Sequence, residues 1–131
     1  MLGKEIDLLK NYPKSKRDTK GRARVITEED REIARQYGKD FFDGDRTYGY
    51  GGFKYMSRFW GPVVPDLQKH FNLTSDSSLL DVGCAKGFML YDIQQHIPSI
   101  NLAGLDVSEY ALENAKEEIK HLVRIGKKLV S

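Results

Sequence analysis

The sequence predicts an α/β fold with a parallel sheet, and two stretches of the chain carry most of that prediction. Residues 79–82 form a short apolar run of the kind that a buried strand uses, and Gly83 ends this run. Apolar residues then recur at helical spacing from Phe88 onward, and residues 102–107 form a second strand-like run. A strand, a glycine turn, a helix and a second strand, in this order, are typical of the first βαβ unit of an open α/β sheet.

Length and composition set limits on the class of protein. The chain has 131 residues, which suffices for one domain with one core. A net charge of +2 gives no reason to expect a nucleic acid or a membrane surface as partner, and no apolar run approaches a membrane span. The N-terminus carries lysines and acids where a secretory signal would be apolar, so we expect a cytoplasmic protein. The single cysteine excludes an internal disulfide.

The N-terminal part is expected to be a basic arm followed by a helix. Residues 1–26 are rich in lysine and arginine but lack interleaved aromatic residues, so we expect a solvated, partly ordered arm. Thr27 and Asp30 have the spacing of a capping box at the start of a helix. Gly38 is the expected end of that helix.

Residues 41–60 alternate aromatic side chains with glycines, with Arg46 and Arg58 among them. This composition is unfavourable for a stable helix, so the sequence predicts a loop. The rings, phenol hydroxyls and guanidiniums of such a loop suit a lid over a bound ligand. The alternative is a loop whose rings only plug the edge of the core. The residues that we expect to act in the lid are Tyr48, Tyr50, Gly51, Arg58 and Trp60.

Apolar periodicity, together with prolines and capping residues, predicts two further helices and a third strand. Residues 62–73 read as a helix with a proline in its first turn, and residues 109–120 read as a second helix with Ser108 as its N-cap. Residues 122–125 are apolar enough to begin a third strand. Asp92 and His96 stand one helical turn apart, but two potential ligands without a third do not predict a metal site.

The glycine spacing after the first strand distinguishes between ligand classes. A dinucleotide-binding turn would have glycines at positions 83, 85 and 88, and only Gly83 is present. The observed pattern, Asp81-x-Gly83-x-Ala85-x-Gly87, instead resembles motif I of class I S-adenosylmethionine-dependent methyltransferases, which is Asp/Glu-x-Gly-x-Gly-x-Gly. Ala85 departs from the family pattern at the middle glycine, a change that we expect to be tolerated if the backbone keeps a negative φ.

The second strand supports the same resemblance, because Asp106 lies at its end, where the family holds the ribose hydroxyls of its cofactor. The resemblance implies S-adenosylmethionine as cofactor and a Rossmann-like fold. It also implies that Arg46 or Arg58 can bind the methionyl carboxylate. No residue can be assigned a catalytic role, and the methyl acceptor is open. The residues implied to bind the cofactor are Asp81, Gly83, Cys84, Ala85, Gly87, Asp106 and Val107.

The resemblance covers only the first part of a class I catalytic domain. We therefore expect an incomplete Rossmann-like fold of two to three parallel strands over residues 74–131, preceded over residues 27–73 by a helical extension with the lid-like loop. The expected function is methyl transfer by a truncated or partial methyltransferase. One alternative is a non-catalytic half-domain remnant or interaction module, whose sheet a second chain could complete. The other is a dinucleotide-binding oxidoreductase.

Overall fold

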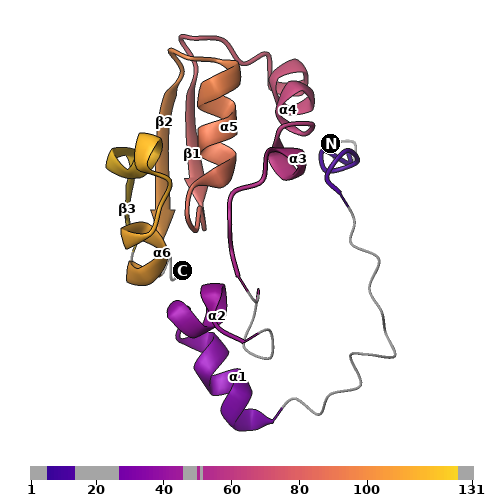
Figure 1. Cartoon of the computed structure of the whole chain (residues 1–131). Helices are drawn as coiled ribbons and strands as arrows, with labels where there is room; N and C mark the ends of the chain where they lie inside the picture. The colour runs from indigo at the N-terminus through magenta and orange to yellow at the C-terminus, as the bar shows by residue number, and fades with distance from the viewer. Residues whose placement is uncertain (1–5, 14–26, 46–49, 51, 127–131) are drawn as a thin grey trace, which may run out of the picture.

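The fold is described by a computed structural model, which covers residues 6–13, 27–45, 50 and 52–126 (Figure 1). It contains one parallel sheet of three strands in the order β1 (Ser78–Val82), β2 (Asn101–Asp106) and β3 (Val123–Ile125). Leu80 pairs with Ala103, and Gly104 pairs with Val123. The sheet and its flanking helices confirm the predicted α/β class and agree with a partial Rossmann-like fold.

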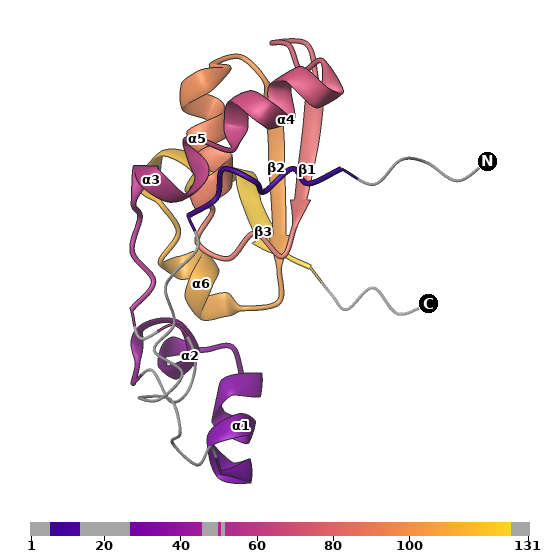
Figure 2. The ribbon, with the colours of Figure 1, turned by 90° about the vertical axis from the view of Figure 1, so that its right-hand side faces the viewer.

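Helix α5 (Phe88–His96) covers one face of the sheet and forms the core with it. Leu90 and Ile93 of α5 are fully buried, and Leu102 and Val123 point to them from β2 and β3. Gly104 keeps this contact close, because a Cβ at this position would lie 2.8 Å from Leu90 Cδ1. In Figure 2, α5 and α6 lie to the same side of the strands.

The other face of the sheet has apolar side chains in the open. The side chains of Leu80 and Val82 are 57% and 59% exposed, although the sequence predicts a buried strand here. The apolar run does form a strand, as predicted. Among the described residues, however, β1 is an edge strand covered on one face only. Strands of an open parallel sheet are normally covered on both faces, and this is what an apolar run without alternation encodes.

The helix expected over residues 109–120 is two elements. Helix α6 spans Glu109–Glu113, and a 3₁₀ helix, η2, spans Glu117–Leu122. The break lets the Lys116 amide donate to the carbonyl of Lys86, and it places Ile119 against Gly87. Contacts with the glycine loop therefore override the helical propensity of this stretch. The predicted N-cap is correct, since Ser108 accepts a hydrogen bond from the Ala111 amide.

Among its described residues, the N-terminal extension forms four short helices: α1 (Glu28–Arg35), α2 (Lys39–Asp43), α3 (Ser57–Trp60) and α4 (Val64–Phe71). The capping box of Thr27 and Asp30 is confirmed. The predicted end at Gly38 is wrong, because α1 ends at Arg35 and Tyr37 takes the left-handed conformation. The Tyr37 carbonyl accepts a hydrogen bond from the Ser108 hydroxyl, which ties this turn to the end of β2.

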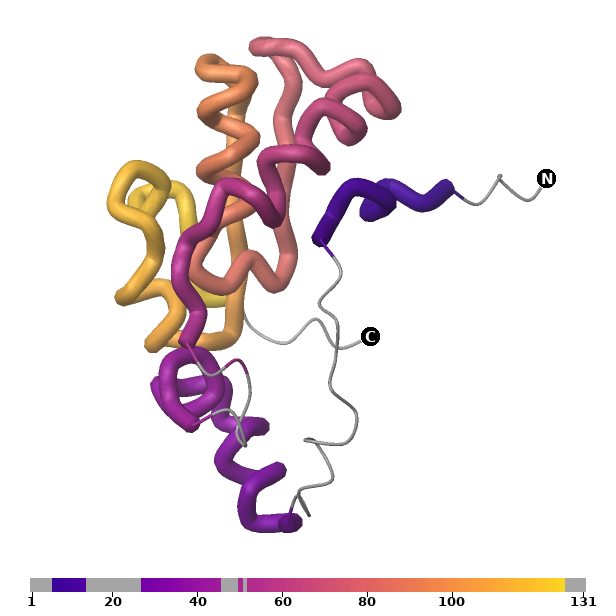
Figure 3. Tube along the Cα trace, turned by 45° about the vertical axis from the view of Figure 1, so that its right-hand side comes forward, coloured from indigo at the N-terminus to yellow at the C-terminus, as the bar shows by residue number. Residues whose placement is uncertain are grey.

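The stretch expected to be a loop over residues 41–60 has helical turns at both ends, in α2 and α3. Between them, the described residues 52–56 run extended from α2 toward α3, as the tube in Figure 3 shows. Phe53 and Tyr55 contact α5 through the rings of Phe88 and Tyr91. We call residues 52–56 the strap. Of the basic arm, residues 1–5 and 14–26 lie outside the described part of the chain.

Candidate functional site

The candidate site is the turn from β1 into α5, at the carboxyl end of the sheet. The amides of Gly83 and Cys84 both donate to the Leu105 carbonyl, at 2.7 and 3.0 Å, which fixes the turn to β2. Gly83 has φ +82°, and a Cβ at this position would meet no atom within 4 Å. Open space over an exposed glycine leaves its backbone accessible to a ligand.

Gly87 is required for a different reason than the sequence suggests. It has φ +77°, and a Cβ there would lie 2.1 Å from Ile119 Cδ1 and 3.2 Å from Ile119 Cγ1. Protein atoms therefore fill the space that a side chain at position 87 would take. The second glycine serves the packing of η2 against the loop, whereas the sequence analysis assigned both glycines to the approach of a ligand.

Ala85 adopts φ +52°, in the left-handed region. The condition under which we expected alanine to be tolerated, a negative φ, is therefore not met. The Asp106 carboxylate compensates in part, because its Oδ2 accepts a hydrogen bond from the Ala85 amide at 2.8 Å. A left-handed alanine costs about 1–2 kcal/mol relative to ordinary helical geometry.

The two predicted carboxylates have different surroundings. The Asp106 carboxylate accepts hydrogen bonds from the amides of Ala85 and Ser108, so it fixes the backbone of the loop. The side-chain carboxylate of Asp81 has no hydrogen-bond partner among the described residues. Burial and the nearby charge of Asp106 raise the pKa of Asp81 to about 6. Two adjacent carboxylates, one of them without a partner, make a site that favours a positively charged group.

Cys84 and Val107 flank this pair of carboxylates. Cys84 is buried, and its Sγ lies 2.8 Å from where a Cβ on Gly104 would be. Burial, with the charges of Asp81 and Asp106, raises the pKa of its thiol to about 12. A thiol in this state is a compact packing group and not a nucleophile. Val107 is exposed directly after β2, so it is available to a ligand at the sheet end.

Sequence reasoning missed Lys86, the charged residue of the glycine loop. Its side chain is buried, and its Nζ donates to Asp43 Oδ2 and to the Phe53 carbonyl, both at 2.7 Å. Asp43 also accepts from the Tyr110 hydroxyl at 2.5 Å and from the Phe53 amide at 2.8 Å. Burial would raise the pKa of Asp43, but these hydrogen bonds outweigh it and lower the pKa to about 2. A lysine inside motif I gave no sequence signal of a partner 43 residues away.

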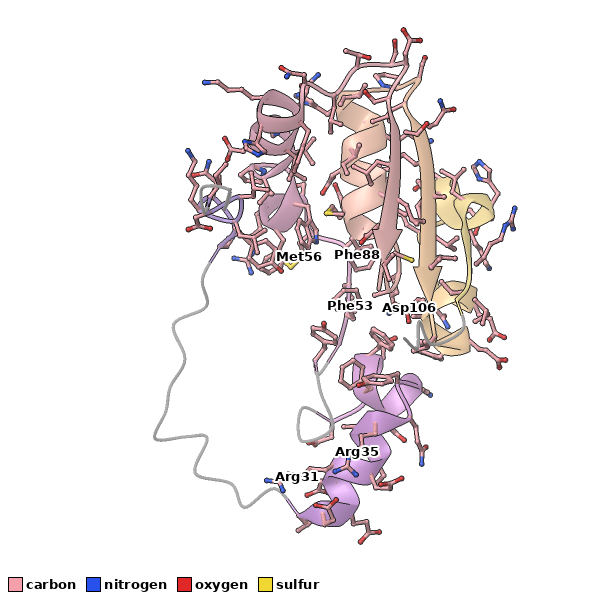
Figure 4. The ribbon with its side chains drawn as sticks, turned by 180° about the vertical axis from the view of Figure 1, so that it is seen from behind. Arg31, Arg35, Phe53, Met56, Phe88 and Asp106 are labelled. Atoms are coloured by element: carbon pink, nitrogen blue, oxygen red, sulfur yellow. The ribbon has the colours of Figure 1, made fainter. Side chains whose placement is uncertain are left out.

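The strap approaches the loop through aromatic contacts. Phe53 stacks on Phe88, the first residue of α5, with ring centroids 4.9 Å apart. Figure 4 shows Phe53 and Phe88 side by side near the sheet end that carries Asp106. The segment that the sequence analysis interprets as a lid therefore contacts the start of α5 through Phe53 and Tyr55, which were not among the expected lid residues.

Three of the expected lid residues are described, and none of the three makes a ring contact with the start of α5. Tyr50 is exposed and contacts Phe42 and Phe53, next to the strap. Arg58 lies over the Phe59 ring, and Trp60 contacts Tyr12, so neither makes a ring contact or hydrogen bond with the glycine loop. Tyr48, Gly51 and Arg46 lie outside the described residues.

A second polar cluster joins the strap to α5. The Tyr55 hydroxyl donates to Asp92 Oδ1 at 2.5 Å, and Lys116 Nζ lies over the Tyr55 and Tyr91 rings, 4.7 and 4.2 Å from their centroids. Asp92 is 8% exposed, and its Oδ2 has no hydrogen-bond partner. Burial raises the pKa of Asp92, against the lowering effect of the Tyr55 hydrogen bond and the Lys116 charge.

The described residues hold neither a cluster of metal ligands nor a membrane-spanning helix. They contain no group of three or more histidines, cysteines, aspartates or glutamates placed to hold a metal ion. None of their helices combines the length and the apolar character that crossing a membrane requires.

The comparisons with known proteins bear on the same part of the chain. Residues 73–126 match the model of a family described as a methyltransferase domain. The comparisons with curated proteins and with solved structures found no match. The matched residues contain all three strands, the glycine loop and Asp106. Residues 73–126 are therefore similar to a methyltransferase domain, in agreement with the resemblance that the motifs indicate.

Proposed function

We propose that the protein binds S-adenosylmethionine at the glycine loop and takes part in the transfer of its methyl group to an acceptor. The observation that supports this proposal most is the open backbone at Gly83 beside two adjacent carboxylates, inside the residues that match the family. An open glycine suits the close approach of a nucleoside, and the carboxylates suit the positive charges of this cofactor.

Each residue of the site then has a role that its surroundings allow. Asp106 orients the loop through the amides of Ala85 and Ser108, and its remaining lone pairs can accept from a ribose diol. Asp81, which has no partner of its own, can accept a hydrogen bond from the methionyl ammonium. Gly83 leaves room for the ligand above the turn.

When bound, S-adenosylmethionine supplies a methyl group that its positively charged sulfur already activates. The chain then has to align two partners and exclude water, more than to provide acid or base. The contacts of Phe53 and Tyr55 with Phe88 at the start of α5 support a part for the strap in this task. A general base is needed only if the acceptor is protonated at working pH, and we assign none.

Isothermal titration tests the proposal and separates it from its rivals. We expect the chain to bind S-adenosylmethionine and its demethylated product, S-adenosylhomocysteine, with no heat from NAD. No heat from either sulfur compound at millimolar concentration would favour the half-domain remnant. Heat from NAD alone would favour the dinucleotide-binding alternative.

A variant at the loop localises the binding. Gly83→Val puts a β-branched side chain at φ +82°, in the space that we assign to the ligand. We expect it to abolish binding, and circular dichroism checks that the protein is still folded. Gly83→Ala is the milder second variant for the same position. A folded Gly83→Val protein that binds normally would contradict the placement of the cofactor.

A further inference from the structure

The side chain of Lys86 connects the glycine loop to the N-terminal extension. It is 8% exposed, which is unusual for lysine, and both of its hydrogen bonds go to the extension, at Asp43 and Phe53. A buried ammonium is tolerated only when it is paired and hydrogen-bonded. If the extension moves away from the loop, Lys86 therefore loses its partners.

The backbone of Lys86 lies within the strained part of the loop. It stands between Ala85 at φ +52° and Gly87 at φ +77°, two left-handed residues separated by one position. The carbonyl of Lys86 accepts from the Lys116 amide at 3.0 Å, so the residue is held at its backbone and at the end of its side chain. A loop with this conformation depends on such external contacts to keep one shape.

Asp43 joins four elements through one carboxylate. It accepts from Lys86 in the loop, from Tyr110 in α6 and from the Phe53 amide in the strap, while its own backbone belongs to α2. The loop follows β1, and α6 follows β2. The carboxylate therefore connects the ends of the two strands that carry Gly83 and Asp106.

We propose that Lys86 and Asp43 are positioning residues for the cofactor loop, and that their ion pair couples docking of the extension to binding of the cofactor. This inference rests on the function proposed above. In the paired state, the strap lies against Phe88 and the loop keeps the conformation that exposes Gly83. Without the pair, the strap and the loop become less ordered together. The free energy of ligand binding is then less favourable, because binding has to order both segments.

Amide hydrogen exchange without any ligand tests the coupling between strap and loop. We expect Lys86→Met to speed exchange at least tenfold both at residues 84–87 and at residues 52–56. Ile93→Val, which removes a methyl group from the buried core, is the control for a general loss of stability. In the control, exchange in these two segments should change only in proportion to global stability. Faster exchange in the strap alone, or in neither segment, would overturn the proposal.

Titration with S-adenosylhomocysteine tests the coupling to the ligand. We expect Lys86→Met and Asp43→Asn each to weaken binding at least tenfold, and the double variant to weaken it no further than the worse single variant. Additive losses, or affinity equal to that of the wild type in either single variant, would contradict a shared role. If Lys86→Met does not fold, Asp43→Asn preserves side-chain volume and decides both tests.

The exchange experiment and the titration together separate this inference from the function that it rests on. Failure of the wild-type protein to bind S-adenosylhomocysteine would refute the proposed function, because no variant is involved in that result. The exchange experiment uses no ligand and would still decide whether Lys86 and Asp43 couple the extension to the loop.

Discussion

Replacement of Asp81 by asparagine should stabilise the protein and weaken ligand binding at the same time. Burial and the charge of Asp106 raise the pKa of Asp81 from 3.8 to about 6, so the folded state resists ionisation of this carboxyl group. Asparagine has the same shape without the charge. The site therefore carries an electrostatic cost in the free protein that a positively charged ligand would relieve.

The size of the stability gain in Asp81→Asn and its pH dependence follow from the raised pKa of Asp81. Below pH 3.8 the carboxyl group is protonated in the folded and the unfolded state, and Asp81→Asn should have no electrostatic effect. Between pH 3.8 and 6 the unfolded chain ionises first, so the wild-type protein loses stability as pH rises, and the loss is complete above pH 6. The upper limit is about 3 kcal/mol, and because Asp81 is partly exposed we expect on the order of 1 kcal/mol.

Urea unfolding at pH 3.5 and pH 7.5 measures this difference, with the exposed Asp76→Asn as control. We expect Asp81→Asn to gain stability over the wild type only at the higher pH, and Asp76→Asn to show no such difference. Affinity for S-adenosylhomocysteine should rise with pH through about 6 in the wild type and stay flat and at least tenfold weaker in Asp81→Asn. Equal stability gains at both pH values, or unchanged affinity, would refute the reasoning.

Three further substitutions test the loop. Gly87→Ala should lower the free energy of unfolding by about 2–4 kcal/mol, because it adds backbone strain and a clash with Ile119. In a double-mutant cycle, Ile119→Val should recover part of that loss, and additive losses would disprove the clash. Ala85→Gly should relieve the strain at φ +52° and gain about 0.5–1 kcal/mol in urea unfolding, whereas a loss would show that the alanine is not strained. Asp106→Ala should weaken cofactor binding by about 1–3 kcal/mol and destabilise the loop, because two amides lose their acceptor; calorimetry with unchanged affinity would remove Asp106 from the site.

The residues that the sequence identified well are those whose roles are local. The motif from Asp81 to Gly87 follows from a strand, a turn and a helix that are contiguous in the chain, and the structure has all three. The caps at Thr27 and Ser108 are also local, because each side chain bonds a backbone amide three residues away. Short-range geometry of this kind is encoded in the spacing of residue types.

The features that sequence reasoning missed depend on contacts across the chain. Lys86 and Asp43 are 43 residues apart, and nothing near either of them predicts the other. The break after α6 has the same origin, since Lys116 and Ile119 serve the glycine loop and not their own helix. The exposed face of β1 was not predicted, because an apolar run indicates a strand covered on both faces but does not say which part of the protein covers each face.

Chemical-shift mapping of backbone amides during titration with S-adenosylhomocysteine tests the central claim most directly. The account predicts saturable shifts that concentrate at residues 83–87 and 106–108, with smaller shifts in the strap at residues 52–56. Shifts confined to other parts of the molecule, or no shifts at millimolar ligand, would contradict a cofactor site at the glycine loop.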